Sequence, residues 1–249
     1  MISKNKISEI KKLSQKKFRE ETGLFIVEGS KSVHDLLFSQ ITVKELFATK
    51  DWILGHADWL RGVEAVEVSE TELGRISALT TPQQVLAVAE IPQHELSEVD
   101  FADALLVLDG IRDPGNLGTM IRTADWFGFR QVLCSPDTVE FTNPKTIQAT
   151  MGSFSRMKVY YTDLVAFLKN PAIQGTIYGT FMSGKPIQSA DFQKNDILII
   201  GNEGKGISAE VEACVQQKIH IPSYAVSAEH AESLNASIAA AVVMYQFRQ

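Results

Sequence analysis

The sequence lacks several features that would point directly to a class of protein. It has only 2 cysteines in 249 residues, Cys134 and Cys214, which are too few for a disulfide framework or a cysteine-based metal cluster. The longest apolar run, Ile238 to Tyr245, is far below the ~20 residues that a membrane-spanning helix needs. The first residues are charged and lack the apolar core of a signal peptide. These absences favour a protein of the reducing cytoplasm.

An overall excess of positive charge is also missing. The net charge of -6 argues against indiscriminate binding of polyanions. The segment from Met1 to Arg19 is different, because it carries seven basic residues against one acid, Glu9. The seven are Lys4, Lys6, Lys11, Lys12, Lys16, Lys17 and Arg19. This segment is either a local patch for phosphates or a solvated helix face.

The common nucleotide-binding loops are absent. The run Ile197 to Ile200 predicts a buried parallel strand, and Gly201, Gly204 and Gly206 then predict a tight turn. Lys205 is followed by glycine and not by Ser or Thr, so the turn is no P-loop, and it is not GxGxxG either. Glycines at the carboxyl end of a strand let backbone approach a ligand closely, although a plain tight connection has the same pattern.

Strands and helices alternate along the whole chain, which predicts an α/β fold with a parallel sheet in the second half. Residues 92–100 carry acids and little apolar content, and they predict a linker. We therefore expect a small α/β domain at 1–91, a linker at 92–102 and a second domain at 103–249. The expected strands cover 24–27, 43–48, 65–68, 85–91, 104–108, 131–134, 158–161, 176–181, 197–200 and 218–221. The main expected helices cover 3–19, 51–61, 116–127, 163–169, 208–215 and 233–247.

The expected last helix, 233–247, is apolar on nearly every face. A helix that is apolar all round is buried all round. It therefore packs on the sheet with one side and on a second subunit with the other, or it is buried within one subunit.

Three stretches in the second half carry polar residues beside expected strand ends. They are Asn116-x-Gly118-x-x-x-Arg122, Gly201-x-Glu203-x-x-Gly206, and Ile221-Pro222 followed by Ser233-Leu-Asn235-Ala-Ser237. In this order they resemble the three motifs of the SpoU (TrmH-type) RNA ribose 2′-O-methyltransferases of the SPOUT superfamily, over residues 104–249. The first half resembles the L30e-like substrate-binding domain of that family, from Lys16-Lys-Phe-Arg19 to Gly29.

The resemblance implies an L30e-like domain followed by a SPOUT domain with a C-terminal trefoil knot. It also implies a homodimer formed through the C-terminal domain and methyl transfer from S-adenosylmethionine to a ribose 2′-hydroxyl of rRNA or tRNA, without a metal. The implied cofactor-binding residues are Thr180, Gly201, Glu203, Gly206, Ile221 and Leu234.

Arg122 is the expected catalytic residue on the RNA side. A helical side chain leans over the residue one turn back, and Gly118 leaves that space free. Because a guanidinium stays protonated, we expect Arg122 to bind the phosphate beside the target ribose and to stabilise the developing alkoxide. The resemblance also implies site roles for Asn116, Ser233 and Asn235. Asn116 and Ser233 are alternatively plain helix caps.

One segment departs from the family. Residues 223–232 lack glycine and form a longer loop than is usual there, so the cofactor contacts in this loop stay open. His230 is expected to be an exposed loop residue, and His220 a core or edge histidine. The altered loop favours a rival interpretation, a non-catalytic RNA-binding or ribosome-assembly module with the same fold. A generic nucleotide-binding enzyme would need a fingerprint that the chain lacks.

Overall fold

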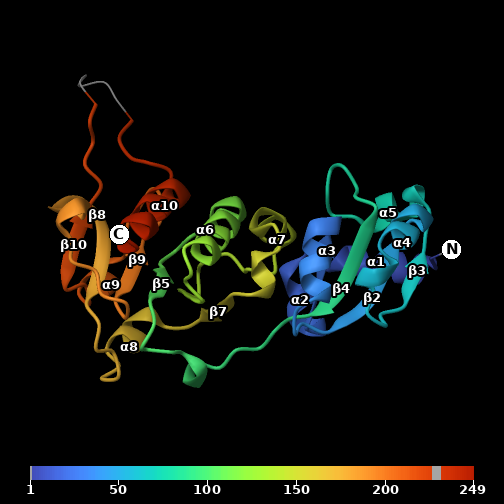
Figure 1. Ribbon diagram of the computed structural model, residues 1–249, viewed down its shortest axis with the longest axis horizontal. Coiled ribbons are helices and arrows are strands. Elements are labelled where there is room, and N and C mark those ends of the chain that lie inside the picture. The colour runs from blue at the N-terminus through green and yellow to red at the C-terminus, as the bar shows by residue number, and fades with distance from the viewer. Residues whose placement is uncertain (1, 226–230) are drawn as a thin grey trace. The chain divides into compact units, whose positions relative to one another are not determined.

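The computed structural model describes residues 2–225 and 231–249, which form two compact units. Unit 1 comprises Met1–Gln93 and Glu140–Arg156, and unit 2 comprises His94–Val139 and Met157–Gln249. The expected α/β alternation is present in both (Figure 1). Residues 140–156, which the sequence assigns to the second domain, pack in unit 1.

Unit 1 is built on a four-stranded sheet with the order β1-β4-β2-β3. β4 is antiparallel to β1 and β2, and β2 is parallel to β3. The strands are β1 (Leu24–Glu28), β2 (Val43–Ala48), β3 (Ala65–Glu67) and β4 (Val85–Glu90). The helices are α1 (Lys4–Lys12), α2 (Lys16–Thr22), α3 (Ser30–Leu37), α4 (Lys50–Gly55), η1 (Ala57–Trp59), α5 (Glu70–Ile76), α7 (Pro144–Thr150) and η3 (Ser153–Ser155).

The basic segment at the N-terminus forms two helices, so the single helix expected over 3–19 is wrong. The Ser14 hydroxyl donates to the Lys11 carbonyl at 2.7 Å, a local bond that competes with helix continuation. Arg19 also differs from the expected phosphate patch. Its side chain is 2 % exposed and forms an ion pair with Glu140, so it is part of the packing of unit 1. Lys11 and Lys12 stay exposed at the end of α1.

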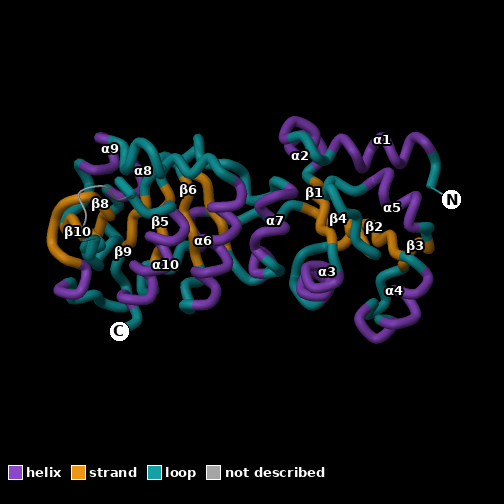
Figure 2. The backbone as a smooth tube through the Cα atoms, turned by 90° about the horizontal axis from the view of Figure 1, so that it is seen from above, coloured by secondary structure: helices purple, strands orange, loops and turns teal. Residues whose placement is uncertain are grey.

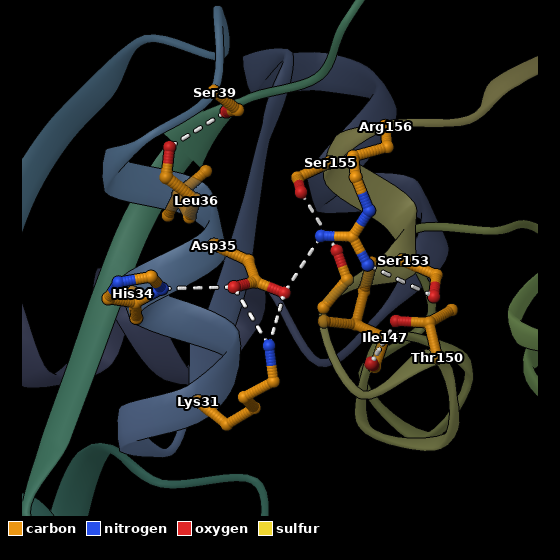
Figure 3. A network of polar contacts seen from close by, with 11 residues as sticks. Lys31, His34, Asp35, Leu36, Ser39, Ile147, Thr150, Ser153, Ser155 and Arg156 are labelled. Carbon is orange, nitrogen blue, oxygen red and sulfur yellow. Dashed lines mark hydrogen bonds and ion pairs between the residues drawn. The ribbon is translucent and has the colours of Figure 1, made fainter. Parts of the chain in front are cut away.

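A network of polar contacts joins α3 to the segment 153–156 (Figure 3). The buried Asp35 carboxylate accepts from Lys31 Nζ at 2.8 Å and from Arg156 Nη1 at 2.9 Å, and His34 Nδ1 lies 3.0 Å from it. Burial opposes ionisation of Asp35, but these contacts outweigh it and lower the pKa of Asp35 to about 2. A Cβ on Gly152 would lie 2.8 Å from the Asp35 Cγ, so glycine is required there. The network therefore fixes this segment on α3.

Unit 2 contains a six-stranded parallel sheet with the order β10-β8-β9-β5-β6-β7. The strands are β5 (Leu105–Leu108), β6 (Gln131–Cys134), β7 (Lys158–Tyr161), β8 (Ile177–Pro186), β9 (Ile197–Ile200) and β10 (Gln217–His220). The helices are η2 (Leu96–Glu98), α6 (Pro114–Trp126), α8 (Leu164–Leu168), η4 (Ile187–Ser189), α9 (Ala209–Glu212) and α10 (Ala236–Phe247). Figure 2 shows α8 and α9 on one face of this sheet and α6 and α10 on the other. The trefoil knot stays a prediction.

The last helix, α10, is buried on one side and exposed on the other. Ala240, Val243 and Met244 are fully buried, whereas Ile238 and Tyr245 are 52 % and 54 % exposed. Complete burial within one subunit is therefore wrong.

Strand β8 leaves its register with β10 in the middle. Lys218 pairs with Gly179, but the next residue, Ile219, pairs with Lys185. The five residues from Thr180 to Gly184 therefore form a bulge between these pairs. Thr180 lies where the bulge begins, and its hydroxyl donates to the Ile199 carbonyl at 3.2 Å.

Candidate functional site

The three polar stretches meet at the carboxyl ends of β5 and β9. Asn116 Nδ2 donates to Glu203 Oε2 at 3.2 Å. Asn235 Nδ2 donates to Asn116 Oδ1 at 3.0 Å and to Glu203 Oε2 at 3.3 Å. Parallel strands place their carboxyl ends at one edge of a sheet, where such folds bind ligands. Two amides and one carboxylate, far apart in the sequence, thus form a single polar triad.

The first stretch opens α6 in an unexpected way. The helix begins at Pro114, and its N-cap is Asp113, whose Oδ1 accepts from Asn116 N at 2.7 Å. The expected start of this helix at residue 116 is therefore two residues too late. The alternative of Asn116 as a plain cap is wrong. Because Asp113 already caps the helix, the Asn116 side chain is available for the triad.

The second stretch folds into a closed loop after β9. Asn202 and Gly206 exchange two backbone hydrogen bonds, at 3.0 and 2.8 Å. A Cβ on Gly201 would lie 2.6 Å from the Gly206 carbonyl oxygen, so the loop closes only over a glycine. Gly206 has φ +70°, a left-handed conformation that favours glycine. The loop is therefore fixed by its backbone, and it holds the exposed Glu203 at its tip.

Two residues that the sequence did not single out fasten this loop to the end of β5. Asp109 is 7 % exposed, and its Oδ2 accepts from Ser208 N at 2.7 Å. Asn202 Nδ2 donates to the Gly110 carbonyl at 2.7 Å. A signal for Asp109 was present, because an acid directly follows the apolar run 104–108.

The third stretch places Asn235 at the start of α10. Asn235 is the N-cap, and its Oδ1 accepts from Ser237 N at 3.0 Å and from Ile238 N at 3.4 Å. The start expected at Ser233 and the Ser233 cap are therefore wrong, and Ser233 lies exposed before the helix. The two ends of one amide thus have separate tasks. The oxygen caps the helix, and the nitrogen donates into the triad.

The third stretch and the end of β10 also carry residues that suit a ligand with apolar and polar parts. Leu234 is 47 % exposed directly before Asn235, and Ile221 is half-buried directly after β10. Within the described part of the chain, the buried His220 Nδ1 has no hydrogen-bond partner. An adenosyl group and a charged amino acid end would use such surfaces. His230 lies outside the described residues.

A separate hollow in unit 1 has a different character. Its volume is about 450 Å³, and its lining includes Glu67, Glu70 and Glu72. A cluster of carboxylates suits neither a phosphate nor an adenosyl group, so we do not assign the cofactor to it.

Arg122 lies exposed on α6, one turn after the buried Gly118. The side chain is therefore open to a substrate.

Comparison with known proteins identifies the family of the chain. Residues 103–245 match the SpoU rRNA methylase family, and residues 4–87 match the MRM3-like substrate binding domain. The chain belongs to the SpoU rRNA methylase family. It is 34 % identical over 245 residues to the 23S rRNA (guanosine(2553)-2′-O)-methyltransferase RlmP of Bacillus subtilis, covering 98 % of this chain and 96 % of that protein.

Two solved structures extend the likeness to the whole fold. One is a putative RNA methyltransferase of the TrmH family from Porphyromonas gingivalis, with a TM-score of 0.87 and 35 % identity, covering 100 % of this chain and 98 % of that one. The other is the AdoMet-bound rRNA methyltransferase from Sinorhizobium meliloti, with a TM-score of 0.87 and 29 % identity, covering 100 % of this chain and 96 % of that one. The expected family and α/β architecture are confirmed.

Two further observations concern residues 2–225 and 231–249 alone. No helix there is long and apolar enough to cross a membrane. No three or more His, Cys, Asp or Glu side chains there are grouped so that they could hold a metal ion.

Proposed function

We propose that this SpoU family member transfers a methyl group from S-adenosylmethionine to a ribose 2′-hydroxyl of ribosomal RNA. The observation that carries the proposal is the triad of Asn116, Glu203 and Asn235, in which all three motifs meet. The full-length similarity to an enzyme named for 23S rRNA favours ribosomal RNA over transfer RNA. The cytoplasm is the expected location.

The chain's own residues would bind and orient the reactants. When bound, S-adenosylmethionine supplies a methyl group on a positively charged sulfur, which a ribose oxygen displaces in line. Gly201, Gly206 and Ile221 would hold the cofactor mainly through backbone groups, with Leu234 and Thr180 at its edges. Fixed alignment of two reactants is worth up to ~7–11 kcal/mol of the barrier in favourable cases.

Arg122 would bind the phosphate next to the target ribose. Its planar fork donates two parallel hydrogen bonds to a phosphate, and its charge stabilises the oxygen as the proton leaves. Phosphate or water would take that proton. Arg122→Lys keeps the charge but loses the fork, so we expect a large loss of turnover, and near-normal turnover would contradict the clamp.

A homodimer through the C-terminal domain is part of the proposal. Ile238, Val242 and Tyr245 follow one another at helical spacing on the exposed side of α10, with exposed fractions of 52 %, 36 % and 54 %. Trp126 at the end of α6 is 84 % exposed, and the rings of Phe127 and Tyr245 lie 6.1 Å apart, so the two helices join at this surface. An exposed apolar surface of this kind marks an interface. A second copy of the chain would cover this stripe by placing the same apolar side chains against it.

The basic N-terminal helices and unit 1 would hold the RNA. Lys11 and Lys12 are exposed on α1, and unit 1 matches a substrate-binding domain. Phosphate contacts of this kind make affinity fall with salt.

Incubation with total RNA and radiolabelled S-adenosylmethionine, followed by mapping of 2′-O-methyl sites, tests the proposal. We expect label in ribosomal RNA and none with Arg122→Ala. Cofactor binding without labelled RNA would support the rival, a non-catalytic RNA-binding module.

A further inference from the structure

Unit 1 carries a column of planar side chains, each in contact with the next. Neighbours in the column lie 4.1 to 4.7 Å apart, measured between ring centroids or from the guanidinium carbon to the ring. In order, its members are Trp52, His56, Trp59, His34, Phe38 and Arg61. The planes of Trp52 and His56 and those of His34 and Phe38 are stacked, at 19° and 22°, whereas Trp59 is tilted by 59° to His56 and meets His34 edge-on at 75°. They lie on α3, α4 and η1, directly after α3 and α4, and in the turn after η1. Figure 2 shows α3 and α4 on the same side of the unit 1 sheet.

The inner end of the column is fixed by hydrogen bonds. Trp52 is 1 % exposed, and its Nε1 donates to Ser30 Oγ at 2.8 Å. His56 Nδ1 lies 2.8 Å from the Trp52 carbonyl oxygen, and His34 Nδ1 lies 3.0 Å from Asp35 Oδ1. The rings on which Phe38 packs are therefore already oriented, which lowers the entropy cost of ordering the outer end of the column.

The outer end is open to solvent. Phe38 is 48 % exposed, and the Arg61 guanidinium lies 4.7 Å from the centre of its ring. Arg61 has φ 49°, a left-handed conformation that is uncommon for a residue other than glycine. It is followed by Gly62 at φ 88°, so a tight turn directs the chain here. The fold thus presents an aromatic ring and a planar cation together at the surface.

The charges nearby decide what this surface suits. Asp51 and Asp58 lie on α4 and η1 and offset Lys50 and Arg61. The surface is therefore no groove for a phosphate backbone. A flat neutral group is different, because unpaired nucleobases stack on aromatic rings and on guanidinium planes.

We propose that the Arg61 guanidinium, held over the Phe38 ring, is a stacking platform for an unpaired nucleobase of the RNA substrate, which packs beyond Arg61 at the open end of the column. This inference rests on the proposed function, since it assumes that unit 1 meets RNA. It adds that recognition there uses an unpaired base and not only the phosphates.

The test compares binding of two short single-stranded RNA probes to the full-length chain. One is an oligouridine, and the other has the same length with abasic sites. We expect the wild-type chain to prefer the oligouridine about tenfold, as one stacked base provides. Phe38→Ala should remove this preference while binding of the abasic probe stays unchanged. Arg61→Lys keeps the charge and loses the plane, so it should reduce the preference in part.

A matched control is Leu54→Ala. Leu54 is 70 % exposed on α4 but is outside the column, and its replacement should leave the preference intact. Equal affinity of the wild-type chain for both probes would overturn the platform, as would a preference that survives Phe38→Ala. The platform would also be overturned if Phe38→Ala lost affinity for both probes equally, or if it changed the oligomeric state of the chain. Phe38 would then have a structural or protein-contact role.

The outcome is separable from that of the proposed function. Loss of the platform should raise the KM for the RNA and leave kcat nearly unchanged. If methyl transfer is absent altogether while the base preference persists, the proposed function fails and the platform stands.

Discussion

Replacement of Asn235 by aspartate separates the two tasks of this side chain. Its Oδ1 caps α10 through Ser237 N at 3.0 Å, while its Nδ2 donates to Glu203 Oε2 at 3.3 Å. Aspartate keeps an oxygen for the cap and loses the donor. It also sets a second carboxylate beside Glu203. The fold and the site should therefore respond differently to this one change.

The magnitudes can be estimated from this geometry. Loss of an N-cap costs about 0.5–2 kcal/mol, and Asn235→Asp avoids this cost. A negative charge at a helix N-terminus adds about 0.3–1 kcal/mol of stability. Repulsion between two exposed carboxylates about 4 Å apart is of order 1 kcal/mol in water. The gain and the repulsion nearly cancel, so the expected destabilisation of Asn235→Asp is the loss of the two Nδ2 hydrogen bonds, at about 0.5–1.5 kcal/mol each.

Binding and turnover should fall sharply in the same variant. The triad loses its hydrogen bonds to Asn116 and Glu203, and like charges replace them. Two neighbouring carboxylates raise the pKa of one of them, so a shared proton restores a donor as the pH falls. Cofactor affinity of Asn235→Asp, measured by calorimetry, should therefore recover in part between pH 7.5 and pH 5.

Asn235→Ala is the matched variant, because it loses both tasks. Its free energy of unfolding should be lower than that of Asn235→Asp by about 0.5–2 kcal/mol, the value of the cap, and its cofactor affinity should show no recovery in acid. Chemical denaturation and radiolabelled methyl transfer measure the two effects. If Asn235→Asp turns over at the wild-type rate, the proposed role of the amide nitrogen is refuted. If Asn235→Asp and Asn235→Ala have the same free energy of unfolding, the capping role of the oxygen is refuted.

Three further predictions concern other parts of the chain. Gly201→Ala should destabilise the fold by about 1–3 kcal/mol in denaturant titration, because the new Cβ meets the Gly206 carbonyl oxygen at 2.6 Å, and an unchanged midpoint would contradict this. Asp35, with its pKa lowered to about 2, contributes stability that is present above its unfolded pKa near 4 and is lost as the pH falls toward 2. Thermal unfolding should show that Asp35→Asn removes about 1–2 kcal/mol at pH 7 and flattens this acid limb. Ile238→Glu should convert the proposed dimer to monomer in sedimentation, whereas Leu54→Glu in unit 1 should not.

The strands of unit 2 were predictable because a parallel sheet buried on both faces needs continuous apolar runs. The runs before Asp109 and Gly201 are of this kind, and both are strands. Because the two strands are parallel, their carboxyl ends share one edge of the sheet, and Asn116 and Glu203 meet there. The helix α7 was missed, although Asn143 and Pro144 at its start form a common N-terminal signal.

The exact helix starts were not predictable, because several residues compete for each cap. Ser233 and Asn235 are both good caps by type, and so are Asp113 and Asn116. The choice of Asn235 over Ser233 as the cap of α10 depends on the contact of Asn235 with Glu203, and these two residues are 32 positions apart. Arg19 illustrates the same limit, since its partner Glu140 lies 121 positions away and a run of lysines masks its burial.

The position of Asn235 also connects the site to the exposed stripe on α10. Its oxygen fixes the first turn of that helix by accepting from Ile238 N at 3.4 Å. Ile238 is also the first residue of the exposed stripe. Its nitrogen is held by Asn116 and Glu203. A helix end held from both sides transmits displacement, because packed elements move as units and do not deform continuously. Assembly of the triad and the position of the α10 stripe, at which we propose the dimer contact, are therefore parts of one structural arrangement.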